Sequence, residues 1–233
     1  MNPRARRHRR LRRTRFGLGL ALTLSLAFAA GMTDAIGLIL VGRYVSFMSG
    51  NTTQLGVSLV EGDGGSGLFL AAILACFVAG NALGEIVMRA ANRRHSVLLT
   101  CIALLVAMPV FLGVMPWAIL PAVVGMGMLN AGVEQIDGHA FGITFVTGAL
   151  SRFGRGLGRR LMGDRNGAWR YQLVPWLGMF AGALAGAFSH AALGQNALLA
   201  SAGACILLAL VSHAIPATWR RGYVSPARPA RRG

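Results

Sequence analysis

Asp34 is the first residue whose type and position could do chemistry. It lies well inside an apolar run that begins at Phe16, and an ionisable side chain at membrane depth is a functional candidate by default. Such a carboxylate could carry a proton, bind a cation or hold a substrate amine. The competing interpretation is structural: a hydrogen bond to the interrupted stretch that follows at residues 45–60, or an ion pair with Arg43.

A polar turn, Ser49-Gly50-Asn51-Thr52, interrupts the next moderately apolar stretch, residues 45–60. Irregular backbone at membrane depth persists only where protein or a water-filled cavity satisfies it. We expect Gly50 to supply the turn and Ser49 or Asn51 to cap a half-helix running to Val60. The positive end of that half-helix could hold an anionic or polar group. The alternative is a capped turn that only packs the fold.

A second polar set follows in the later part of the chain, at Asn130 and then Thr144, Thr147 and Gly148. It repeats the chemistry of the first set without the carboxylate and without the second Asn, and a threonine can also simply bond its own helix backbone. The expected substrate-binding residues are therefore Asp34, Ser49, Gly50, Asn51, Thr52, Asn130, Thr144, Thr147 and Gly148.

The elements that must position these residues are long apolar runs. Charged residues make up 13% of the 233 and gather between runs that approach or exceed the roughly 20 apolar residues of a bilayer-spanning helix. We expect an all-α membrane protein with six transmembrane helices, at residues 16–41, 68–88, 96–114, 117–136, 171–193 and 197–215. Residues 45–60 and 140–150 are too short or too polar for full spans, so we expect two re-entrant broken segments.

The basic residues orient this arrangement. All 23 are Arg, and they concentrate in the two tails and in the segments 89–95 and 151–170, which we expect to be loops. Arginine-rich connections stay on the cytoplasmic side. The six-span order places every Arg except Arg43 there, with both termini cytoplasmic in a bacterial inner membrane. The net charge of +16 then indicates the bilayer and its anionic lipid headgroups as partners, rather than nucleic acid.

An internal repeat supports the same order. Residues 31–35 (GMTDA) match 127–131 (GMLNA), and residues 47–50 (FMSG) match 145–148 (FVTG). Each half therefore contains three spans and one broken segment, and an odd number of spans inverts the second half, as in many secondary transporters. We expect a loose tail at 1–15, repeats at 16–114 and 115–216, and a second tail at 217–233. Small-residue motifs that pack helices closely occur at equivalent places in both halves, at Gly80, Gly84, Gly182 and Gly186.

These paired motifs resemble those of a known family. Residues 31–35 with 46–52 (SFMSGNT), and 127–131 with 144–150 (TFVTGAL), are similar to the signature of the YoaK-like bacterial membrane proteins over residues 16–216. Ser49 departs from the Thr usual there, and Leu129 from the Gln that often precedes the Asn. The resemblance implies a multi-pass inner-membrane protein of unestablished function.

The function that we expect is a secondary transporter or channel-like permease for a small polar or anionic solute. The alternative is a non-transporting scaffold or lipid-binding protein. We expect no enzyme, cofactor or metal, because the sequence lacks the common catalytic motifs and its three cysteines have no ligand or redox spacing. We expect the glycine motifs to pack helices within one chain. Formation of a homo-oligomer is the alternative that the sequence leaves open.

Overall fold

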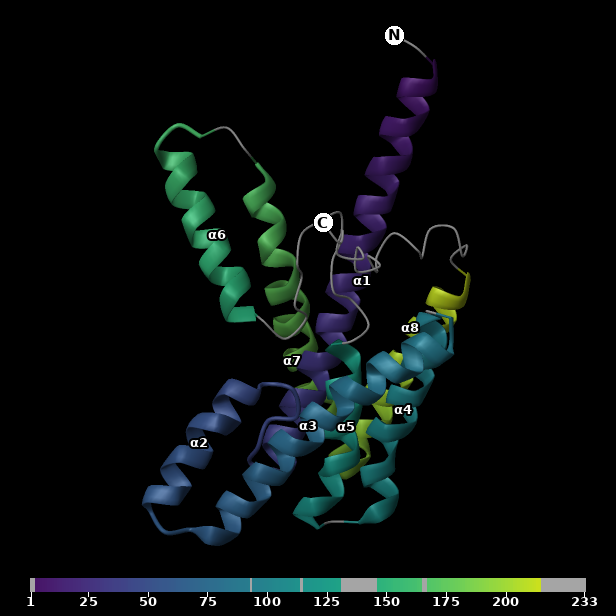
Figure 1. The fold of residues 1–233 in the computed structure, drawn as a ribbon. Helices are drawn as coiled ribbons and strands as arrows, with labels where there is room; N and C mark the ends of the chain where they lie inside the picture. Colours follow the sequence, from purple (N-terminus) through teal and green to yellow (C-terminus); the bar gives the residue numbers. More distant parts are fainter. Residues whose placement is uncertain (1–2, 93, 114, 131–145, 165–166, 215–233) are drawn as a thin grey trace, which may run out of the picture.

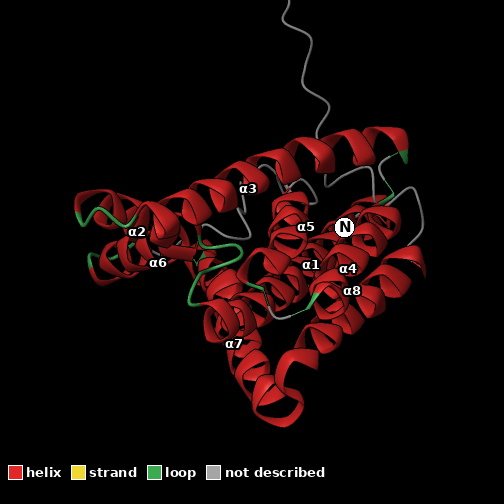
Figure 2. Cartoon of the chain, turned by 90° about the horizontal axis from the view of Figure 1, so that it is seen from below, coloured by secondary structure: helices red, strands yellow, loops and turns green. Residues whose placement is uncertain are grey.

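All regular elements that the computed structural model describes are helices (Figures 1 and 2). It describes residues 3–92, 94–113, 115–130, 146–164 and 167–214. The predicted all-helical fold is confirmed for these residues. The helices are α1 (Pro3–Val41), α2 (Met48–Val60), α3 (Gly64–Ala90), α4 (His95–Leu112), α5 (Leu120–Asn130), α6 (Val146–Leu161), α7 (Leu173–Leu193) and α8 (Ala197–Ala214), with short 3₁₀ turns at Pro116–Ile119, Ala168–Gln172 and Gly194–Asn196.

The apolar helices are suited to a bilayer. Within the described residues, four segments are long and apolar enough to cross a membrane: Phe16–Val41, Gly64–Ala90, His95–Leu112 and Trp169–Ala214. The last is 46 residues long and contains both α7 and α8. Many of their large side chains face outward, such as Phe111 at 79% exposure and Phe188 at 74%. Apolar surface on this scale needs lipid around it rather than water.

The fifth apolar run is only partly described. It starts with the 3₁₀ turn and continues as α5 to Asn130, and the rest of the expected span 117–136 lies outside the described residues.

Each long helix packs against one main partner. α1 lies along α7, α3 along α5, and α4 along α8, with α5 also touching α4. Leu26 and Ile36 of α1, Ile73 of α3 and Met126 of α5 belong to one buried core that joins these pairs. In both views α2 and α6 lie on the same flank of the bundle, away from α4 and α8 (Figures 1 and 2).

The α1–α7 pair is held by glycines at its crossing. A Cβ atom added at Gly178, Gly182 or Gly186 would overlap the backbone carbonyl oxygen of Leu24, Phe28 or Met32, respectively. The two helices are thus parallel and in backbone contact. Such contact is possible only where a side chain is missing, which is the geometry of small-residue motifs.

The α3–α5 pair has the same kind of crossing. A Cβ atom at Gly80 would overlap the carbonyl oxygen of Val124, and one at Gly127 that of Phe77. Gly84, further along α3, is buried as well. The glycines that the sequence assigns to helix packing therefore lie on the inner faces of these two pairs.

The helices alternate in direction. Short connections make α3–α4, α4–α5 and α7–α8 antiparallel neighbours, while α1 is parallel to α7. One pocket brings together the last residues of α1 and α4 with the first residues of α8. We call this the distal end of the bundle, and the opposite end, where the span of α1 begins, the N-terminal end.

Two segments differ from their predicted structure. α1 begins at Pro3, so most of the expected tail at 1–15 continues the helix, as proline at a first helical position and arginine's helix propensity allow. α6 runs to Leu161, although we expect residues 151–170 to be a loop. Apolar residues recur there at helical spacing (Leu150, Phe153, Leu157), with Arg152, Arg155 and Arg159 on the other side, and this pattern forms an amphipathic helix.

Candidate functional site

The chain after α1 folds back along α1 instead of leaving the bundle. Gly42 ends the helix with a φ of +70°, a conformation that glycine adopts without strain. Residues 45 and 46 then return to the level of Asp34, which lies about two helical turns before Val41. From there α2 starts at Met48 and runs outward again to the turn before α3. This segment thus has the reversal expected of a broken element.

The Asp34 carboxylate holds this reversal in place. Its Oδ1 accepts hydrogen bonds from the backbone N–H groups of Val45 and Ser46, both at 2.7 Å, and its Oδ2 accepts one from the Ser46 hydroxyl at 2.7 Å. Asp34 is only 5% exposed and Ser46 2%. We call these contacts the Asp34–Ser46 cluster. A buried carboxylate is tolerated when it is hydrogen-bonded in this way, and its place beside the amino end of α2 adds to its stabilisation.

Asn51 closes the other side of the same loop. Its side chain accepts a hydrogen bond from the backbone N–H of Tyr44 at 3.1 Å and donates one to the Tyr44 carbonyl at 2.7 Å, so it pairs with that residue as a neighbouring strand would. Asn51 is fully buried. Gly50 makes room for the loop, because a Cβ atom there would lie 2.7 Å from the ring of Phe47.

The expected turn at Gly50 and the expected cap of α2 are both wrong. Residues 49–52 form the first turns of α2, and the chain reverses before them, after Gly42. Phe47 occupies the N-cap position without a side-chain hydrogen bond, and neither Ser49 nor Asn51 caps the helix. Asn51 instead forms hydrogen bonds with the backbone N–H and carbonyl of Tyr44, and backbone groups of this kind need such partners. Ser49 and Thr52 are exposed, and the Thr52 hydroxyl donates to the Met48 carbonyl of its own helix.

The first set of predicted residues is thus brought together in part. Asp34 and Asn51 bind neighbouring residues of one loop, whereas Ser49 and Thr52 point away from it. The ion pair considered between Asp34 and Arg43 does not form, since Arg43 donates to the Gly42 carbonyl and to the Ser66 hydroxyl. The arrangement matches the structural interpretation of Asp34, a hydrogen bond to the broken segment.

The second set is only partly described. Asn130 is the last described residue of α5, and Thr144 lies outside the described residues. Thr147 is exposed on the first turn of α6, and Gly148 is half-buried beside the Arg152 guanidinium.

Sequence comparison places this arrangement in a family. The family described as "Protein of unknown function (DUF1275)" matches residues 22–211. The chain belongs to this family. It is also 47% identical to a UPF0700 transmembrane protein of Rhizobium meliloti (strain 1021), over 94% of this chain and 97% of that protein. No solved structure matches the chain.

These relatives confirm two expectations about this DUF1275 chain. It is an integral membrane protein, and its motif pairs belong to a family of membrane proteins whose function is unknown. The family match covers all four described candidate spans in whole or in part, together with α2 and α6. Neither family description names a substrate.

Sequence reasoning missed several partners in this DUF1275 chain. Ser46 stands within the recognised motif, yet its pairing with Asp34 depends on a loop reversal that spacing alone does not show. Thr33, next to Asp34, shares a 2.6 Å hydrogen bond with Ser201 of α8, and both side chains are fully buried. A polar residue at membrane depth in each of two apolar runs is the signal that could have suggested this link.

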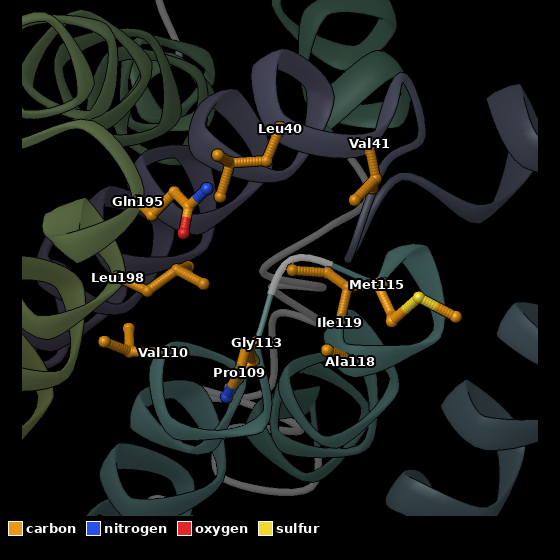
Figure 3. A pocket seen from close by; sticks show the side chains of 10 residues that line it. All are labelled: Leu40, Val41, Pro109, Val110, Gly113, Met115, Ala118, Ile119, Gln195 and Leu198. Atoms are coloured by element: carbon orange, nitrogen blue, oxygen red, sulfur yellow. The ribbon is translucent and has the colours of Figure 1, made fainter.

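A small apolar pocket lies at the distal end of the bundle (Figure 3). Its volume is ≈ 50 Å³, and the side chain of Gln195 reaches into a lining that is otherwise apolar. None of the predicted substrate-binding residues lines it. Among the described residues, no group of three His, Cys, Asp or Glu side chains could hold a metal ion.

Proposed function

We propose that this chain is a secondary transporter or channel-like permease for a small polar or anionic solute. The observation that carries the proposal is the equivalence of its two glycine crossings. Gly31 meets the carbonyl of Met179, three residues before Gly182, and Gly127 meets that of Phe77, three residues before Gly80. The reciprocal contacts have the same offsets, because Gly182 meets Phe28 and Gly80 meets Val124.

Residues that match in the sequence repeat thus occupy matching places in two helix pairs. Gly31 corresponds to Gly127, and Gly182 to Gly80, while α1 and α7 run in the opposite direction to α5 and α3. This supports two inverted repeats of three spans each. Inverted repeats with discontinuous elements between them are a recurring architecture of secondary transporters.

The two broken elements follow the same relationship. α2 lies antiparallel beside the first half of α3, and α6 beside the first turns of α7. They approach from opposite ends of the bundle (Figure 1). Half-helices of this kind point their amino ends inward, where they can attract an anionic or polar group.

The topology can be tested by cysteine labelling of intact cells. In a background with the three native cysteines replaced by alanine, we introduce single cysteines at Glu61, Gln195, Arg94 and Met162, all of which are exposed. An impermeant thiol reagent should label positions 61 and 195, because both lie at the distal end. Positions 94 and 162 should react only after permeabilisation, since arginine-rich ends stay in the cytoplasm. Labelling of position 162 in intact cells would contradict the proposed orientation.

Solute binding is tested with purified protein and a panel of carboxylates, phosphates, amino acids and sugars. A solute at a hundred times its Kd stabilises a protein by about 2.7 kcal/mol, which raises the melting temperature measurably. We expect at least one such increase in wild type. It should weaken in Thr52→Ala but not in Thr53→Ala, because both hydroxyls bond the carbonyl four residues back and only Thr52 is among the residues predicted to bind substrate.

Uptake of that solute into proteoliposomes decides between the two candidate functions. A transporter should accumulate the labelled solute inside the vesicles, and the Thr52→Ala variant should take it up more slowly. Binding without uptake, or a panel without any stabilising solute, would favour the scaffold or lipid-binding alternative.

A further inference from the structure

α6 combines an apolar flank with an arginine flank. Leu150, Leu157 and Leu161 follow one another at helical spacing and are 39%, 42% and 81% exposed. The opposite side carries Arg152, Arg155 and Arg159, which fall on one helical stripe. A helix with these two flanks is typical of a membrane–water boundary, where leucine enters the acyl region and arginine meets the headgroups.

A third face of α6 fastens it to the bundle. Gly156 is buried against Trp169, and the ring of Phe153 lies 5.1 Å from that of Trp169. The Arg152 guanidinium donates to the Gln172 side chain at 2.7 Å. Because this packed face lies between the other two, both the leucines and the outer arginines stay available to surroundings outside the chain.

The depth of α6 in the bilayer follows from its neighbours. Phe16, where the apolar run of α1 begins, stacks edge-to-face on Tyr171 at 4.9 Å between ring centroids. Aromatic side chains of this kind mark the level of the headgroups. Arg152 is bonded to the residue after Tyr171, so it lies near this boundary. The outer arginines follow it along α6, toward the N-terminal end of the bundle.

We propose that α6 is a binding surface for anionic phospholipids of the leaflet at the N-terminal end, with Arg155 and Arg159 contacting headgroup phosphates and Leu150, which precedes them on the bilayer side, contacting acyl chains. Guanidinium groups bind phosphate oxygens bidentately. The described residues of α6 include no acidic side chain, so the charge of this surface matches an anionic leaflet. The inference does not depend on transport.

The test uses the full chain in nanodiscs, with an environment-sensitive fluorophore on a single cysteine introduced as Leu150→Cys. Discs of phosphatidylcholine alone are compared with discs in which phosphatidylglycerol replaces a rising fraction of it. We expect a blue shift that grows with phosphatidylglycerol, because contacts of the arginines with the headgroups hold position 150 in the bilayer. Arg155→Gln and Arg159→Gln should each weaken binding roughly fivefold. Each variant should therefore need a higher phosphatidylglycerol content to reach half of the shift.

Arg94→Gln is the matched control, since this exposed arginine lies at the same end of the bundle but outside α6. It should leave the half-point unchanged, and inorganic phosphate should not reverse the shift. Equal shifts in pure phosphatidylcholine, an equal effect of Arg94→Gln, or reversal by free phosphate would each overturn the proposal. Melting temperatures of the variants, measured in the same discs, verify that all of them are folded.

Discussion

Replacing Gly182 with alanine is expected to destabilise the bundle by about 1–3 kcal/mol, and replacing it with leucine to prevent folding. The added Cβ atom would overlap the Phe28 carbonyl oxygen, so α1 and α7 would have to separate along their length. Backbone atoms cannot turn aside as the end of a flexible side chain can. The measurement is the melting temperature of the purified protein in detergent, together with the yield of monodisperse protein.

Gly203→Ala provides the control for this prediction. Gly203 is also inside an apolar helix, α8, but a Cβ atom there would meet nothing within 4 Å. The substitution should be neutral or stabilising by up to about 1 kcal/mol, because alanine favours the helix. Gly80→Ala, in the equivalent crossing, should be about as damaging as Gly182→Ala. Equal stability of Gly182→Ala and Gly203→Ala would show that the close crossing is not required.

Removal of the Asp34 carboxylate should be the second severe change. Asp34→Ala leaves two backbone N–H groups and the Ser46 hydroxyl buried without their acceptor. Each unsatisfied buried group costs about 1–3 kcal/mol, so we expect a loss of several kcal/mol in unfolding free energy. Asp34→Asn keeps one acceptor oxygen, and Ser46→Ala removes a single hydrogen bond, so both should cost less. Melting curves of the three variants give this order.

A double-mutant cycle between Asp34→Asn and Ser46→Ala isolates the pair. Residues in direct contact usually couple by about 0.5–3 kcal/mol, and we expect a value in that range. The alternative is a carboxylate that acts on a solute or a proton and contributes little to the fold. In that case Asp34→Asn would melt like wild type while its response to a stabilising solute disappeared, and the structural interpretation would be wrong.

Some of the candidate site could be predicted from residue types alone. Asp34 and Asn51 stand out because polar side chains at membrane depth need partners, and both are indeed buried and bonded. The choice of partner could not be predicted, since it depends on the loop after Gly42 reversing along α1. The role of Ser49 as a cap was wrong for the same reason, because that reversal puts Phe47 at the N-cap.

The amino-acid sequence by itself determined that the chain is helical and lies in a membrane. Apolar runs long enough for a bilayer, with arginines between them, are properties of the linear chain. Only the tertiary structure decided that α1 pairs with α7 and α3 with α5, and that Asp34 serves the loop. The physical reason is that these outcomes depend on how closely backbones approach at Gly31, Gly127 and their partners, which are far apart in the sequence and meet only in the folded bundle.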